Sequence, residues 1–214
     1  MWQIIFQNQD VVAINKPAGI AVHQEEGAVH LVHSLAEQLG IERVWLLHRL
    51  DKATSGILLF ALHHQAASDL SQQFADKSMR KTYVALGEGK PLKKQGWIKG
   101  DMAKSRRGSW KLLRSTENPA VTYFQSYAGA AGRRVFMLQP HTGKTHQLRV
   151  AMKSLGCPIV GDERYGGQKA ERMFLHAWRL AFEYKGVHFN LIAPLGKEWP
   201  SETEDFLHSF VNAN

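Results

Sequence analysis

The apolar runs in this sequence are short, and they alternate with helix-like segments in no regular order. The longest run, residues 57–62, is far short of the about 20 residues that a membrane-spanning helix needs. The strict β-α-β rhythm of a doubly wound parallel sheet is absent. A chain of 214 residues suits one domain. The pattern therefore predicts one α+β domain over residues 1–214, with a central, mainly antiparallel mixed β-sheet flanked by helices.

Periodicity places the individual elements. Alternating or continuous apolar stretches predict strands within residues 4–14, 44–47, 57–62, 83–86, 120–127 and 135–138. Apolar residues at helical spacing predict helices over residues 28–39, 65–74 and 145–155, and a last helix after Ser201. Residues 90–111 are too polar and too rich in glycine for an assignment.

Positive charge is concentrated in one stretch. Residues 77–114 hold 12 lysines and arginines, opposed only by Glu88 and Asp101, whereas the whole chain has a net charge of +8. A concentrated basic surface is typical of proteins that bind polyphosphates, because each neutralised phosphate releases condensed counterions. The alternative is a lysine-rich loop that only aids solubility. If the stretch binds a polyphosphate, we expect a basic active-site cleft.

The densest chemical signal is the segment His48-Arg49-Leu50-Asp51-Lys52-Ala53-Thr54-Ser55-Gly56-Ile57-Leu58. It places one carboxylate, Asp51, in a polar loop between two apolar strands. The neighbouring cations Arg49 and Lys52 favour the ionised carboxylate, which is the form that a nucleophile or general base needs. An isolated aspartate in such a loop would more often cap a turn.

This segment resembles the signature of the RluA family of RNA pseudouridine synthases. Other segments resemble motifs of that family in the same order along the chain: Asn15-Lys16-Pro17-Ala18-Gly19 with Val22-His23, Lys81-Thr82-Tyr83-Val84-Ala85, Thr142-Gly143-Lys144-Thr145-His146-Gln147-Leu148-Arg149, Pro158-Ile159-Val160-Gly161-Asp162, Tyr165-Gly166 and Leu175-His176-Ala177. The resemblance covers most of the chain. It differs from the family pattern at Lys144, where arginine is usual, and at Ala151, where histidine is common.

The resemblance implies an isomerase that converts specific uridines in rRNA or tRNA to pseudouridine after base flipping. It makes Asp51 the nucleophile, Tyr83 the side chain that packs against the target base and Arg149 the partner of Asp51. Asp51 would attack the base or the sugar, or remove a sugar proton, and the sequence does not choose among these. A core role for Tyr83 and a surface role for Arg149 are the alternatives that the residues alone leave open.

Further candidate substrate-binding residues lie in the motif of residues 48–58 and in that of residues 142–149. They are Arg49, Lys52, Thr54, His146 and Leu148. Arg49 would contact the flipped nucleotide or fill the gap that it leaves, and a plain loop charge is its alternative. Isomerisation involves no redox change, so we expect no cofactor. The lack of a glycine-rich phosphate loop, an H-E-x-x-H pair and a CxxC pair fits that expectation. No carboxylate or cysteine recurs at ligand spacing beside the histidines, so we expect no metal.

RNA is the expected partner, with no membrane, no obligate protein partner and a monomeric state. The start of the chain has no signal-peptide pattern, and Cys157 is the only cysteine, so we expect a cytoplasmic protein. The sequence resembles a short form of the family that begins at the catalytic region, without an N-terminal RNA-binding domain. RNA recognition would then belong to the catalytic domain.

Two other functions compete with this interpretation. The first is an RNA-binding or RNA-remodelling protein that keeps the fold but depends little on catalysis. Loss of Asp51, Tyr83 or Arg149 would favour it, and all three are present. The second is a hydrolase with an aspartate nucleophile, which predicts a metal site or a phosphate loop.

Overall fold

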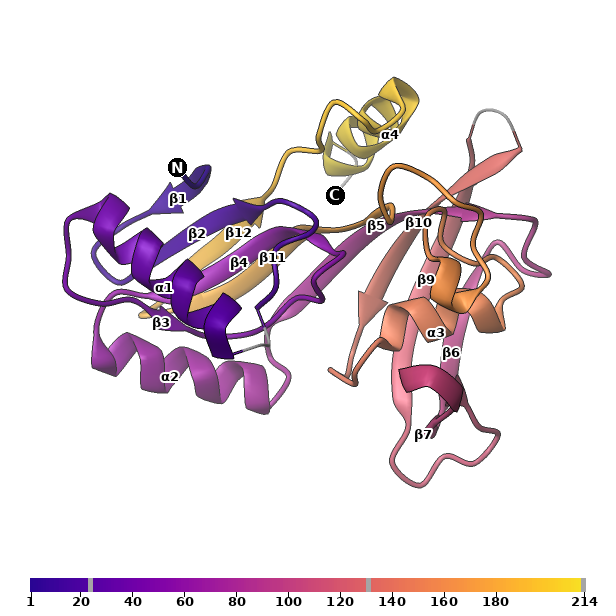
Figure 1. The fold of residues 1–214 in the computed structure, drawn as a ribbon, viewed down its shortest axis with the longest axis horizontal. Coiled ribbons are helices and arrows are strands. Elements are labelled where there is room, and N and C mark those ends of the chain that lie inside the picture. Colours follow the sequence, from indigo (N-terminus) through magenta and orange to yellow (C-terminus); the bar gives the residue numbers. More distant parts are fainter. Residues whose placement is uncertain (23–24, 130–131, 213–214) are drawn as a thin grey trace. The chain divides into compact units, whose positions relative to one another are not determined.

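The computed structural model describes residues 1–22, 25–129 and 132–212 (Figure 1). The chain divides into two compact units. Unit 1 comprises Met1–Lys81 and Ala177–Pro194, and unit 2 comprises Thr82–His176 and Leu195–Asn214. Each unit is therefore built from two separate stretches of the sequence. The single catalytic domain over residues 1–214 stays a prediction.

Unit 1 is a mainly antiparallel β-structure with two helices. Its strands are β1 (Ile4–Gln7), β2 (Val11–Lys16), β3 (Trp45–Leu46), β4 (Ser55–Ala61), most of β11 (Leu175–Tyr184) and β12 (Val187–Ile192). They are ordered β1-β2-β4-β11, with β3 paired to β4 and β12 paired to β11. The helices are α1 (Glu25–Leu39) and α2 (His64–Ala75). Every residue of β4 is buried, which explains why this strand reads as a continuous apolar run.

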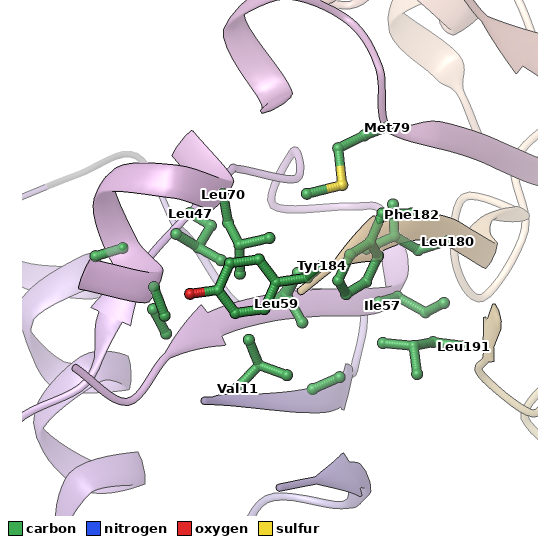
Figure 2. Close-up of a cluster of buried hydrophobic side chains, with 14 of the residues drawn as sticks. Val11, Leu47, Ile57, Leu59, Leu70, Met79, Leu180, Phe182, Tyr184 and Leu191 are labelled. Carbon is green, nitrogen blue, oxygen red and sulfur yellow. The ribbon is translucent and has the colours of Figure 1, made fainter. Parts of the chain in front are cut away.

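The core of unit 1 lies between β4 and α2. Leu70 of α2 packs in one hydrophobic cluster with Ile57 and Leu59 of β4, and Phe182 of β11 joins the same cluster (Figure 2). Burying a side chain of this size contributes roughly 1.5–3 kcal/mol of folding free energy. The cluster thus fixes β4, and with it the end of the loop that precedes β4.

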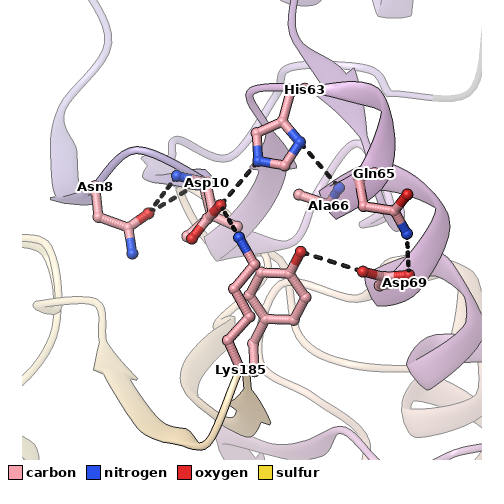
Figure 3. Close-up of polar contacts among 9 residues, drawn as sticks. Asn8, Asp10, His63, Gln65, Ala66, Asp69 and Lys185 are labelled. Atoms are coloured by element: carbon pink, nitrogen blue, oxygen red, sulfur yellow. Dashed lines mark hydrogen bonds and ion pairs between the residues drawn. The ribbon is translucent and has the colours of Figure 1, made fainter.

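A polar network fastens the edge of unit 1. The carboxylate of Asp10, in the turn between β1 and β2, accepts hydrogen bonds of 2.8 Å from His63 Nε2 and from Lys185 Nζ (Figure 3). His63 Nδ1 accepts the backbone N–H of Ala66 at 3.2 Å, so the same ring caps α2. Asp10 therefore joins three elements: the first turn, the start of α2 and the turn between β11 and β12.

Unit 2 contains a second antiparallel arrangement. Its strands are most of β5 (Arg80–Glu88), then β6 (Gln95–Gly100), β7 (Met102–Lys104), β8 (Trp110–Leu112), β9 (Ala120–Ala128) and β10 (Arg133–Pro140). Four of them are ordered β5-β10-β9-β6, and β7 and β8 form a separate hairpin. Its helices are α3 (Gln147–Ser154) and α4 (Ser201–Asn212).

The α+β fold class is confirmed, and each predicted strand and helix is present with shifted ends. Helix α1 begins at Glu25, earlier than predicted. Helix α3 begins at Gln147 and not at residue 145, because His146 has a left-handed backbone with φ of 56°. The unassigned stretch forms β6, β7 and β8. In β6 the alternation is obscured because Gly100 occupies a buried position and Trp97 an exposed one.

Candidate active site

Asp51 lies in the loop of residues 47–54, between β3 and β4 of unit 1. The backbone N–H of Thr54 donates to the carbonyl of Asp51 at 3.0 Å, which closes a tight turn. Thr54 is buried, Asp51 is partly exposed, and Arg49 and Lys52 are exposed. The loop therefore buries its base in the protein and leaves Asp51 partly exposed between two exposed cations.

Gly56 fixes the end of this loop. Its φ of +112° is a conformation that residues with a side chain rarely adopt. A Cβ at this position would lie 2.3 Å from the carbonyl oxygen of Ala177 on β11. Only glycine lets the chain enter β4 so close to that strand, so this part of the motif has a packing reason.

Lys16 fastens the loop to the N-terminal motif. The Lys16 side chain is wholly buried, and its ammonium donates to the carbonyls of Pro17 at 2.8 Å, Ile20 at 3.0 Å and Lys52 at 3.4 Å. The Lys52 carbonyl also accepts the N–H of Gly19 at 2.7 Å. The residue after Asp51 is thus held by two donors from a motif more than 30 positions earlier.

His48 holds the other end of the loop. Its Nε2 accepts the backbone N–H of Leu59 at 3.0 Å, and its ring stacks on Phe74 with centroids 4.6 Å apart. Desolvation, with a smaller contribution from the charge of Lys81, lowers the pKa of His48 from 6.5 to about 3. The neutral ring is the form that can accept the Leu59 N–H, so His48 positions the loop without carrying charge.

This geometry predicts a pH dependence of stability. The pKa of His48 is lowered in the folded state, so the unfolded chain binds the extra proton and stability falls as pH drops from about 6.5 toward about 3. Between pH 7 and pH 4.5 the loss from this group is about 2 kcal/mol. We expect His48→Gln, which keeps an acceptor but does not titrate, to reduce the difference between urea midpoints at these two pH values.

The control for that measurement is His208→Gln, because His208 is an exposed histidine on α4. This variant should keep the acid sensitivity of the wild type. Equal acid sensitivity in the wild type and in His48→Gln would show that the Leu59–His48 contact does not couple protonation to folding.

In unit 2, Gln147 organises the approach to α3. Its Oε1 accepts from Thr142 Oγ1 at 2.7 Å and from the N–H of Lys144 at 3.0 Å. Its Nε2 donates to the carbonyl of Val121 and to Thr122 Oγ1, both at 3.0 Å. The loop before α3 is therefore bound to β9, and the helix that carries Arg149 starts from a fixed point.

Arg149 is held by a bidentate ion pair. Its Nε and Nη2 donate to the two carboxylate oxygens of Asp162, each at 2.8 Å, and the two side chains are only 10% and 2% exposed. The guanidinium also lies 4.9 Å from the ring centroid of Tyr165. Two parallel hydrogen bonds and a ring fix the plane of the guanidinium. The partnership of Arg149 with Asp51 stays a prediction.

Tyr165 links this pair to His146. The Tyr165 hydroxyl accepts the N–H of Trp110 at 3.0 Å and lies 2.7 Å from His146 Nδ1. Burial raises the pKa of Tyr165, so the hydroxyl keeps its proton and can donate it to His146. Tyr165 thus orients His146 while its ring supports Arg149.

The predicted site residues form two groups. One loop of unit 1 carries Asp51, Arg49, Lys52 and Thr54. Unit 2 carries Tyr83, His146, Leu148 and Arg149.

The burial of these residues differs. Tyr83 is half-buried on β5, in register with Leu138 of β10. Thr54 and Leu148 are 3% and 7% exposed, which leaves little of either side chain for RNA. The substrate-binding roles of both groups stay predictions.

Comparison with known proteins decides the family. Residues 10–154 match the family model described as RNA pseudouridylate synthase, and this stretch is more than half of the chain. The chain belongs to this family. It is an RNA pseudouridine synthase, and therefore an isomerase whose substrate is RNA.

Individual relatives agree with this assignment. An uncharacterized RNA pseudouridine synthase of Haemophilus influenzae is 49% identical over 184 residues, which cover 85% of this chain and 82% of the relative. A ribosomal large subunit pseudouridine synthase C of Rickettsia bellii is 37% identical over 205 residues, covering 90% of this chain and 68% of the relative. The solved structure of Human RNA Pseudouridylate Synthase Domain Containing 4 has a TM-score of 0.78 at 27% identity, covering 91% of this chain and 89% of that one.

In this synthase, four residues hold the loops of the candidate site in place, and the sequence analysis did not predict this role for any of them. Lys16, His48, Gln147 and Asp162 all lie inside the recognised motifs, yet none was given a role. The sequence carried a signal only for Asp162, as an acidic residue in a motif beside apolar residues. Lys16 donates hydrogen bonds to backbone carbonyls, and Gln147 binds a backbone N–H and a carbonyl around a turn. Backbone partners of this kind cannot be recognised from the sequence.

The two departures from the family pattern occupy different environments in the synthase. The ammonium of Lys144 donates to Asn118 Oδ1 at 2.8 Å, which braces the loop before β9. Ala151 is buried on α3. Lys144 thus has a local structural partner, and the core accommodates a small residue at position 151.

Among the described residues, no three histidine, cysteine, aspartate or glutamate side chains lie close enough together to hold a metal ion. No helix in the described ranges is long and apolar enough to cross a membrane.

Proposed function

We propose that this enzyme isomerises specific uridines in ribosomal or transfer RNA, with Asp51 as its nucleophile after base flipping. The observation that carries the proposal is the geometry of the loop of residues 47–54. Asp51, which is partly exposed, lies in a turn of this loop. Lys16 binds the loop at the Lys52 carbonyl, and His48 binds it to the backbone N–H of Leu59. A fixed, accessible carboxylate suits covalent or proton-transfer chemistry. Relatives named ribosomal large subunit pseudouridine synthase C support an rRNA substrate.

The reaction divides the chemistry among few groups. The bond between N1 of uracil and C1′ of ribose breaks, the base turns, and a bond from C5 to C1′ forms. C5 then loses its proton and N1 gains one, so atoms and electrons balance without an oxidant or a metal. Asp51 would attack the base or the sugar, or remove a sugar proton. The target nucleotide must leave its stack to reach the carboxylate.

Tyr83 and Arg149 are proposed to serve the same nucleotide. Tyr83, half-buried on β5, offers a ring for stacking and a hydroxyl for the proton at C5. Arg149 is proposed to keep Asp51 ionised, the role that the family resemblance gives it. Its bidentate contact with Asp162 supports this role, because a preoriented cation needs no rearrangement during the reaction.

The basic stretch is proposed to hold the RNA backbone. Eleven of its twelve cations are exposed, and only Lys81 is partly buried. We expect neutralisation of Lys93, Lys94, Arg106 and Arg107 to weaken RNA binding and to reduce the slope of log affinity against log salt by up to about one unit per lost phosphate contact. Filter binding over a salt series measures this slope. An unchanged slope would return the stretch to a solubilising role.

The experiment that tests the proposed function is pseudouridine mapping across all RNA of cells with and without this gene. A site should vanish on deletion and return with the wild-type chain but not with Asp51→Asn. If no site in rRNA or tRNA depends on the gene, the proposed substrate is wrong. If Asp51→Asn restores the site, Asp51 is not the nucleophile, and the competing function as an RNA-binding protein is favoured. We further propose that the enzyme acts as a monomer in the cytoplasm, without an obligate protein partner.

A further inference from the structure

The outer face of β6 carries an exposed tryptophan. Along this strand Gln95, Trp97 and Lys99 are exposed while Ile98 and Gly100 are buried, as expected for alternating side chains. Trp97 is 53% exposed and is the only aromatic side chain among the large hydrophobic residues that the described ranges leave exposed. An indole in solvent at the edge of a sheet calls for an explanation.

The neighbours of Trp97 form a mixed aromatic and cationic surface. The rings of Tyr123 and His141 lie 5.1 Å and 5.0 Å from the Trp97 ring, both tilted by 59°. The ammonium of Lys99 lies 5.3 Å from the Trp97 ring centroid. We refer to Trp97, Lys99, Tyr123 and His141 as the Trp97 platform.

Strand register separates this platform from Tyr83. Tyr83 is paired with Leu138, and Leu138 is paired with Phe124, so these three side chains share one face of the strands of unit 2. Trp97 is paired with Tyr123, the residue next to Phe124, so the platform lies on the opposite face. The platform is therefore a surface distinct from the face that presents Tyr83.

We propose that the Trp97 platform binds a single-stranded segment of the substrate RNA, away from the target uridine, by stacking bases on its rings. This inference rests on RNA being the substrate. Every base has a π-face, so an exposed indole flanked by two further rings can take bases of any sequence. The ammonium of Lys99, 5.3 Å from the Trp97 ring centroid, adds a positive charge that can pair with the phosphates of the same segment.

The composition of the same face argues against a protein partner. On this face Met137 is buried, and the side chains around the platform that stay exposed or half-buried include Gln95 on β6, Gln125 on β9 and Gln139 on β10. Amides and a lysine supply hydrogen bonds and charge for nucleotides, but not the continuous apolar centre of a stable protein interface. Strand β6 ends the order β5-β10-β9-β6, and exposed lysines on an edge strand discourage pairing with a second chain.

The test is binding of a fluorescent oligouridylate of roughly 12 nucleotides, measured by anisotropy. We expect Trp97→Ala to weaken binding by about tenfold, Trp97→Phe to retain most of the affinity, and Trp97→Leu to behave like the alanine variant. Leucine keeps an apolar side chain without a π-face, so the comparison of Phe with Leu isolates stacking. With long substrate RNA, Trp97→Ala should raise KM and leave kcat unchanged.

Several outcomes would overturn the proposal. Wild-type affinity in Trp97→Leu would exclude stacking, and a loss of kcat without a change in KM would make Trp97 a structural residue. A concentration-dependent dimer that Trp97→Ala dissociates would assign the face to a second copy of the chain.

Leu92→Ala, at an exposed position in the loop before β6, serves as the control. If the wild-type chain formed no pseudouridine, the proposed function would fail, while the oligouridylate assay would still decide the platform.

Discussion

Asp51→Asn is expected to abolish pseudouridine formation, in single-turnover as well as in multiple-turnover assays. The substitution keeps the shape of the side chain and removes the charge that attack or proton removal requires. No neighbour in the loop can substitute, since Arg49 and Lys52 are cations and an unaided Thr54 hydroxyl is a poor nucleophile. Tritium release from RNA labelled at carbon 5 of uridine measures the loss directly.

The variant should remain folded and keep its affinity for RNA. The turn at Asp51 is closed by its backbone carbonyl, and the loop is anchored through Lys16 and His48, none of which the substitution touches. Asp205→Asn, at an exposed position on α4, is the matched control and should release tritium at the wild-type rate. Tritium release by Asp51→Asn near that rate would disprove the nucleophile assignment. A variant that fails to fold would be replaced by Asp51→Glu, which keeps the charge but moves it by one methylene group.

The sequence predicted strand β4 better than the ends of the helices. Strand β4 is buried along its whole length, so its apolar run has one interpretation. Helix α3 starts after His146 because the backbone of His146 is left-handed. The hydrogen bonds of Gln147 to Thr142 and Lys144 hold the turn before the helix in place. Such a start is set by tertiary hydrogen bonds, and periodicity within one segment cannot report them.

The candidate site shows the same limit. Asp51 could be singled out because its motif resembles that of a known family and because a loop between two apolar strands is readable in the sequence. The anchors of that loop could not, since Lys16 binds carbonyl oxygens and His48 binds one backbone N–H. Every residue has a carbonyl and nearly every residue has an N–H, so a side chain that uses them has no partner of recognisable type in the sequence. Leu148 is buried on α3, and this burial limits its use as a substrate contact.

Asp162→Asn is expected to destabilise the protein severely. Asp162 neutralises the guanidinium of Arg149 through two hydrogen bonds of 2.8 Å, and both side chains are almost wholly removed from solvent. The substitution removes one counter-charge and its bidentate contact from a buried guanidinium, and breaking a buried ion pair costs about 3–5 kcal/mol of unfolding free energy. For a chain of this length that loss lowers the Tm by roughly 10 °C. Arg149→Met should cost a similar amount, because it leaves the carboxylate of Asp162 unpaired.

A double variant, Arg149→Met with Asp162→Leu, separates the stability of this pair from its chemistry. Replacing both members of a buried ion pair by apolar side chains is often neutral or stabilising, so the double variant should melt near the wild-type temperature. If Arg149 keeps Asp51 ionised as proposed, this stable variant should still fail to release tritium. Recovery of both stability and activity would make the pair purely structural and would remove Arg149 from the mechanism. Wild-type melting of Asp162→Asn alone would mean that the ion pair contributes little to folding. The melting temperature and the tritium release of the double variant thus test separately whether Arg149 contributes to folding and whether it contributes to the reaction. A variant that is stable but inactive would show a role in the reaction, because lost packing cannot explain the loss of activity.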